Sequence, residues 1–255
     1  MIQVGSPARP SYTPTVPTAR RDDSAVPTAE ALADVAALGP FFAVSIDPAE
    51  AADPSWRPFP DGVERLIETT AARLGAVEPR VAASTAQLSL AARLWSPVLG
   101  CALLHGVVPD LTPLRHRAAE DGVVPLWLER VRGRRCAGAQ ELAEAAYRAV
   151  AEGRLQAINA AVRERVPLAE GLLWGNAASA LIGTLRVIVA ARPAHADAAR
   201  DLAVRLLGMG RLRGGGVLRG PGLLFRRRSC CLYYRVPGGG LCGDCCLEEP
   251  PAGRR

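Results

Sequence analysis

The chain has 255 residues, of which 49% are hydrophobic, so it can bury a core and is not a disordered protein as a whole. All 31 basic residues are arginine, and without lysine the chain cannot contain a Walker A phosphate-binding loop. The formal net charge is +6, yet the segment from Leu202 to Gly243 holds eight arginines and no acidic residue, which predicts an anionic partner for this segment.

The first half of the chain shows helical periodicity between proline-rich loops. Residues 1–27 are rich in proline, threonine and charge without periodicity, so we expect a disordered leader there. Helical periodicity begins at Thr28, and Gly39 followed by Pro40 ends it. The elements expected next are a short strand at 41–46, a helix at 61–75, a helix at 81–95 interrupted near Pro97, a second apolar segment at 98–108 and a buried strand at 122–128.

The second half continues as helices and then changes character. We expect a helix over 139–165 with a weak point at Gly153, a long buried helix over 168–191 and an amphipathic helix over 195–207. Glycines then break any helix, and extended pieces are expected at 223–227 and 232–236. The predicted fold class is mainly α. We expect a helical body at 28–208, followed by a small irregular, cysteine-rich C-terminal module at 209–249. The module can include a short β-hairpin, and a frayed tail follows at 250–255.

The compartment follows from two expected absences. The first 28 residues have no apolar core, so we expect no signal peptide. The chain contains no run of about 20 apolar residues, so we expect no membrane span. We therefore expect a cytoplasmic protein. In that reducing environment, clustered cysteines serve as metal ligands or redox groups more often than as disulfides.

Five of the seven cysteines fall within 17 residues, from Cys230 to Cys246. Four thiolates satisfy either a tetrahedral zinc ion or the two irons of a [2Fe–2S] cluster. Cys230 and Cys231 are adjacent, and neighbouring residues of an extended segment point in opposite directions, which makes chelation of one ion awkward. The spacing therefore favours an iron–sulfur cluster, while a zinc-stabilised tail and a disulfide pair remain alternatives.

The arginines around these cysteines favour the same choice. A [2Fe–2S] core with four thiolates carries about two negative charges when oxidised and about three when reduced. Nearby cations would offset that charge and raise the reduction potential. The arginines that flank the cysteines are Arg226, Arg227, Arg228 and Arg235.

The stretch from Gly222 to Pro237, together with Leu241-Cys-Gly-Asp-Cys245, resembles the C-terminal signature of the FhuF-like ferric-siderophore reductases, Cys-Cys-x10-Cys-x-x-Cys. The segment Leu172-Leu-Trp-Gly-Asn176 also resembles a family segment. The resemblance spans residue 60 to the end of the chain, but only the last 30 residues are specific. It implies that the ligands of a [2Fe–2S] cluster are Cys230, Cys231, Cys242 and Cys245.

Cys246 departs from the four-cysteine pattern of the family. We interpret it as an inert neighbour of the ligands. A substitute ligand in place of Cys245 and an oxidation-sensitive thiol are the alternatives.

The resemblance also implies a function. An electron would pass from the cluster to siderophore-bound Fe(III), releasing Fe(II) in the cytoplasm, with no catalytic residue beyond the cluster. The expected partners are a ferric siderophore of the hydroxamate type, an unidentified electron donor and the inner membrane face as a peripheral contact, with no nucleic acid. The candidate substrate-binding residues are Trp174, Asn176, Arg226, Arg227 and Arg228. Trp174 packing in the core and Asn176 satisfying a backbone group are the structural alternatives.

Two other functions remain open at this point. A zinc-stabilised module could bind nucleic acid through its arginines, and a non-catalytic protein with the same cluster could sense iron or a siderophore. The other candidate side chains have plainer interpretations: His105, Cys101, Trp95 and Trp127 are expected in the core, Cys136 on the surface or in a loop, and the three histidines are too scattered to form a site.

Overall fold

The computed structural model describes residues 25–75, 77–118, 122–249 and 251. The predicted leader therefore lies outside the described residues except for 25–27, which begin the first helix. The predicted tail lies outside them except for Pro251.

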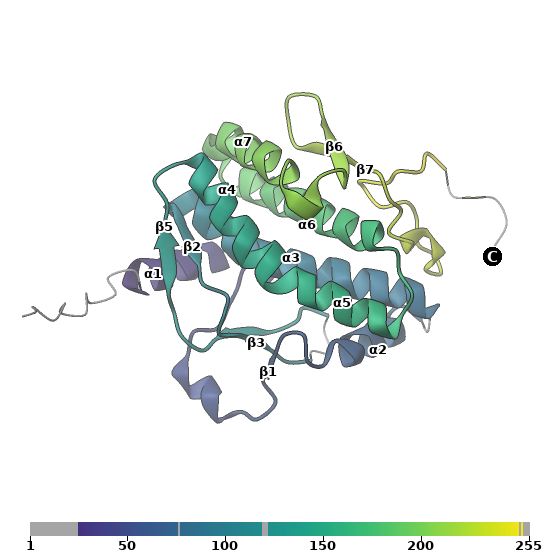
Figure 1. Cartoon of the computed structure of the whole chain (residues 1–255), viewed down its shortest axis with the longest axis horizontal. Helices are drawn as coiled ribbons and strands as arrows, with labels where there is room; N and C mark the ends of the chain where they lie inside the picture. The colour runs from purple at the N-terminus through teal and green to yellow at the C-terminus, as the bar shows by residue number, and fades with distance from the viewer. Residues whose placement is uncertain (1–24, 76, 119–121, 250, 252–255) are drawn as a thin grey trace, which may run out of the picture.

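Helices form the body of the protein, as the sequence predicts (Figure 1). Short strands lie at its edge, and an irregular segment that contains the clustered cysteines ends the chain. In chain order the α-helices are α1 (Ala25–Ala36), α2 (Val63–Arg73), α3 (Pro79–His105), α4 (Ala139–Tyr147), α5 (Gln156–Arg165), α6 (Glu170–Ala191) and α7 (Ala196–Leu207).

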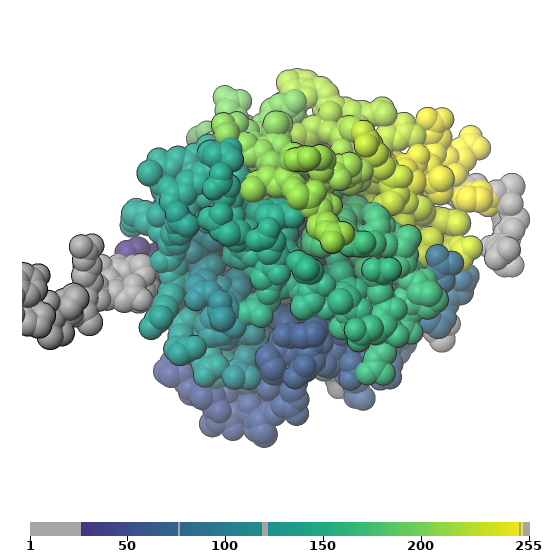
Figure 2. Space-filling model, viewed as in Figure 1, coloured from purple at the N-terminus to yellow at the C-terminus, as the bar shows by residue number. Residues whose placement is uncertain are grey.

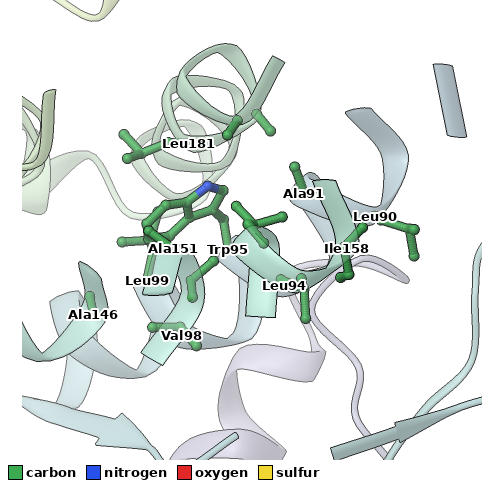
Figure 3. Packing of buried hydrophobic residues seen from close by; sticks show 14 of the residues in the cluster. Leu90, Ala91, Leu94, Trp95, Val98, Leu99, Ala146, Ala151, Ile158 and Leu181 are labelled. Atoms are coloured by element: carbon green, nitrogen blue, oxygen red, sulfur yellow. The ribbon is translucent and has the colours of Figure 1, made fainter. Parts of the chain in front are cut away.

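The centre of the core is the pair α3 and α6, which pack along each other. Figure 3 shows Trp95 of α3 surrounded by residues of several helical segments, among them Leu99, Ala151 and Leu181, all with no exposed surface. By length and composition both helices could cross a membrane, but 67% and 72% of their most apolar windows are buried inside the protein. Here they pack as core helices.

The predicted interruption near Pro97 is wrong, because α3 runs unbroken from Pro79 to His105. Proline removes one helical hydrogen bond and normally kinks or ends a helix. Tertiary packing overrides that preference here: Trp95 and Val98 are fully buried, and the Ser96 hydroxyl lies 3.2 Å from the Thr184 hydroxyl of α6.

The predicted weak point at Gly153 corresponds to a local change of helix type. A π-helical segment, η2 (Arg148–Leu155), joins α4 to α5, so residues 139–165 form one continuous helical run. Such segments widen the hydrogen-bond ladder and often appear as short insertions in α-helices.

The strands are short and lie at the edge of the helical body. The antiparallel sheet β1-β3-β4 consists of Arg57–Pro58, Leu114–His116 and Leu126–Leu128, so the predicted strand at 122–128 forms only over its last three residues. The strands β2 (Val107–Pro109) and β5 (Gly133–Arg135) form a second antiparallel pair.

The strand predicted at 41–46 is wrong. Only Ser45 forms an isolated bridge, to Trp127. Carbonyls of this segment instead accept hydrogen bonds from the buried guanidinium of Arg93, through Phe41 and Ala43.

The C-terminal module contains one turn of 3₁₀-helix, η4 (Gly210–Leu212), and then the hairpin of β6 (Gly216–Arg219) and β7 (Leu224–Arg227), which confirms the predicted extended piece at 223–227. The extended piece predicted at 232–236 is wrong, since Tyr233–Arg235 form one turn of 3₁₀-helix, η5. Leu232 before it adopts a left-handed conformation with φ of 68°, which turns the chain directly after the adjacent cysteines.

Candidate metal centre

The cysteine module lies against α6 and the beginning of α3. Strand β7 packs on α6, and Figure 2 shows the yellow C-terminal residues at one edge of the molecule. Gly175 of α6 permits this close approach, because a side chain there would collide with the hydroxyl of Ser229. The Ser229 hydroxyl donates to the carbonyl of Gly171, 3.1 Å away. The glycine of the segment Leu172–Asn176 therefore leaves room for the side chain of Ser229.

The fold places the two pairs of predicted ligands near each other. The thiols of Cys231 and Cys242 are hydrogen-bonded to each other. Cys230 lies close enough to Cys231, Cys245 and Cys246 to interact with them electrostatically. A tight turn, in which the Cys245 N–H donates to the Cys242 carbonyl at 3.0 Å, joins the second pair. Each half of the signature thus faces the other across the site.

Backbone N–H groups point at all four of these sulfurs in a repeated pattern. In each case the donor stands two residues after the cysteine. Leu232 donates to Cys230 at 3.3 Å and Leu247 to Cys245 at 3.4 Å. The N–H groups of Tyr233 and Asp244 act on Cys231 and Cys242 in the direction that lowers the thiol pKa. N–H groups directed at sulfur favour thiolates and tune iron–sulfur clusters. The local backbone is therefore suited to metal-bound sulfur.

The thiols of Cys231 and Cys242 have pKa values shifted in opposite directions. The hydrogen bond from Cys242 lowers the pKa of Cys231 to about 6, and the same bond raises the pKa of Cys242. Burial raises the pKa of Cys230. Because metal binding requires thiolates, loading this site releases protons.

Arg227 offers the clearest test of whether the site fits an anionic cluster. Its side chain is only 2% exposed. One guanidinium nitrogen, Nη2, donates to the Asn176 Oδ1 atom and lies 3.5 Å from the Leu172 carbonyl. The other two nitrogens, Nε and Nη1, are buried without a hydrogen-bond partner among the described residues. An unpartnered buried donor costs about 1–3 kcal/mol, and more when it is charged, so the site fits a bound anion beside Arg227.

Asn176 occupies a structural position rather than an exposed one. It has no exposed surface, and its amide nitrogen donates to the carbonyl and hydroxyl of Ser84. The Ser84 hydroxyl in turn donates to the Cys231 carbonyl at 2.7 Å. Asn176 therefore links α3, Arg227 and the first cysteine pair. Trp174 is 5% exposed, so neither predicted residue offers an external ligand much surface.

Sequence reasoning missed Asp244, which stands between Cys242 and Cys245. This carboxyl is 5% exposed, accepts a hydrogen bond from Ser179 at 2.6 Å and forms an ion pair with Arg186 at 3.0 Å. Its carbonyl accepts from the Arg227 N–H at 2.9 Å. The signal was available, because Asp244 is the first acidic residue after the long acid-free segment. Ser84 and Ser179, by contrast, had no sequence signal.

The other predicted arginines have different surroundings. Arg226 donates to the Cys246 carbonyl at 3.1 Å and pairs with Glu248 at 3.3 Å. Arg235 pairs with Glu78 at 2.7 Å, and Arg228 is exposed. The fold therefore distinguishes Arg227 from its neighbours.

The remaining cysteines and histidines lie elsewhere. Burial raises the pKa of Cys101 to about 12 and also raises that of Cys136, which lies in a loop, as one of the two predicted alternatives has it, but is buried. His105 is half-exposed and pairs with Asp34 at 2.9 Å, so its predicted core position is wrong. Within the described ranges, no group of three or more His, Cys, Asp or Glu side chains, the clustered cysteines included, is placed so that it could hold a metal ion.

The comparisons with known proteins concern the same segment. Residues 227–247 match the family model described as the FhuF 2Fe-2S C-terminal domain. No curated protein and no solved structure matches the chain. The match supports a [2Fe–2S] cluster as the cofactor of this module. It covers the whole cysteine signature and is consistent with an FhuF-like family, as the sequence resemblance predicts.

Proposed function

We propose that this protein is a cytoplasmic ferric-siderophore reductase. The observation that supports the proposal most is the proximity of two cysteine pairs and a buried arginine within a segment similar to the FhuF 2Fe-2S C-terminal domain. In this proposal Cys230, Cys231, Cys242 and Cys245 hold the cluster.

The reaction needs one electron for each iron. Siderophore-bound Fe(III) accepts the electron and becomes Fe(II), which hard oxygen ligands hold more weakly. When bound, the cluster supplies one-electron redox chemistry. The electron comes from a low-potential one-electron donor. The chain itself has to hold the metal, set its electrostatic surroundings and bring the substrate close.

A groove beside the module is our candidate docking surface for the siderophore. It has a volume of about 420 Å³ and lies between α6, α7 and the tip of the β6–β7 hairpin. Apolar residues such as Val189 and Leu223 line it together with Arg186 and Arg200. Because Arg186 also holds Asp244 between two predicted ligands, the groove lies next to the metal centre.

These contacts revise the predicted substrate site. The burial of Trp174 and Asn176 favours the structural alternatives for both residues, and the contacts of Arg227 point inward. Arg226 and Arg228 retain exposed surface and stay in the proposal as contacts for an anionic substrate or donor. A hydroxamate siderophore and a peripheral contact with the inner membrane face also belong to the proposal.

The test is reoxidation of the reduced protein under anaerobic conditions. On mixing with a ferric trihydroxamate, we expect the visible absorption of the oxidised cluster to return and one Fe(II) per cluster to appear in a ferrous chelator. The matching gallium(III) trihydroxamate, which cannot accept an electron, should leave the cluster reduced. If ferricyanide reoxidises the cluster but ferric hydroxamate does not, the protein is no reductase for this substrate and the sensing alternative gains support.

A further inference from the structure

Four arginines flank the cysteines, and Arg227 is the buried one among them. It ends strand β7, where side chains alternate between the body and solvent. Phe225 and Arg227 face inward, while Leu224 is exposed and Arg226 is half-buried. The hairpin register therefore places the positive charge of Arg227 on the inward face of β7, towards the helical body.

One guanidinium nitrogen of Arg227 is hydrogen-bonded, and the other two have no hydrogen-bond partner among the described residues. Asn176 accepts from Nη2, and the backbone N–H of Arg227 donates to the Asp244 carbonyl. Nε and Nη1 have no hydrogen-bond partner among the described residues, and no carboxylate in this set lies within ion-pair distance of the guanidinium. The buried charge thus has two free donors and no anion of its own.

The neighbours of the guanidinium identify the anion that it fits. Arg227 interacts electrostatically with both Cys231 and Cys242, one thiol from each half of the signature. A guanidinium presents several N–H groups in a rigid plane and stays charged, which suits it to a fixed anionic partner. A cluster ligated by four thiolates is such a partner.

We propose that Arg227 is the charge partner and hydrogen-bond donor of the [2Fe–2S] cluster and raises its reduction potential, with Asn176 as its positioning residue. Reduction adds one negative charge to the cluster, and a fixed cation in a buried setting stabilises the more negative state more strongly. The inference rests on the cluster of the proposed function and not on the substrate.

The experiment is a potentiometric titration of the holoprotein, followed by visible absorption. In Arg227→Gln the equilibrium constant for reduction should fall at least about tenfold, a shift of about 59 mV for a one-electron couple. The matched control is Arg228→Gln, which removes the same charge one residue away from an exposed position. Its potential should stay close to that of the wild type, because water and salt screen an exposed charge.

A second measurement needs no variant at the buried position. The wild-type protein is produced with arginine labelled with ¹⁵N in the guanidinium, and the reduced cluster is studied by pulsed electron paramagnetic resonance. We expect a ¹⁵N coupling to the cluster, and Arg228→Gln should retain it.

Equal potentials for Arg227→Gln and the wild type would overturn the inference, as would the absence of a ¹⁵N coupling. Either result would leave the reductase proposal intact, because both are measured without substrate. Failure of the reductase proposal has a different signature, namely a cluster that ferric hydroxamate does not reoxidise.

Discussion

Replacing Cys231 by serine should abolish both the visible absorption of the cluster and the turnover of ferric siderophore. Cys231 is 3% exposed, and its thiol has the lowered pKa of the cysteine pair. A hydroxyl is not a thiolate, so one iron would lose a soft ligand in a position that water cannot easily fill. The measurement is the absorption spectrum of anaerobically purified protein, followed by the reoxidation assay.

The matched control is Cys136→Ser. Cys136 is also a buried cysteine, but it follows β5 at the opposite end of the body from the C-terminal module (Figure 1). This variant should keep the full spectrum and full turnover. Retention of either property in Cys231→Ser would remove Cys231 from the ligand set.

Replacing Asp244 by alanine should loosen the loop between Cys242 and Cys245 and accelerate loss of the cluster. The carboxyl anchors this loop to α6 through Ser179 and Arg186. Hydrogen bonds to a charged group contribute about 1.5–3 kcal/mol each, but the ion-pair part is weaker here because Arg186 is 42% exposed. We expect a loss of about 1–3 kcal/mol in the stability of the loop.

The measurement for Asp244→Ala is the rate at which an iron chelator bleaches the oxidised holoprotein. The control is Glu248→Ala, which removes a carboxyl that is 85% exposed and pairs with Arg226. That variant should bleach at the wild-type rate, because exposed ion pairs contribute about 0–1 kcal/mol. If both variants bleach at the wild-type rate, Asp244 does not anchor the metal centre.

Much of the helical body could be predicted from the sequence. Apolar periodicity and terminating glycines or prolines give the approximate positions of α1, α2, α6 and α7. Pro97 was misleading for a physical reason: local propensity predicts a break there, whereas burial against α6 keeps α3 continuous. The weak pattern at 41–46 failed similarly, because a distant residue, Arg93, determines where those carbonyls point.

The metal centre was predictable only in part. The clustering of cysteines indicates a metal site, since its chemistry is carried by residue type, and the family resemblance implies which four of them are the ligands. The sequence cannot separate Arg227 from Arg226 and Arg228, because three consecutive arginines look alike until the strand register buries one of them. Ser84 was equally hidden, and Asn176 was named as a candidate without its partner Arg227, since the hydrogen bonds of both residues join segments far apart in the chain.

The most direct test of the central claim is the metal and sulfide content of anaerobically purified protein, measured together with its electron paramagnetic resonance spectrum. We predict about two irons and two inorganic sulfides per chain, and a signal that appears on reduction, as for one [2Fe–2S] cluster. A colourless protein with stoichiometric zinc and no inorganic sulfide would contradict the claim.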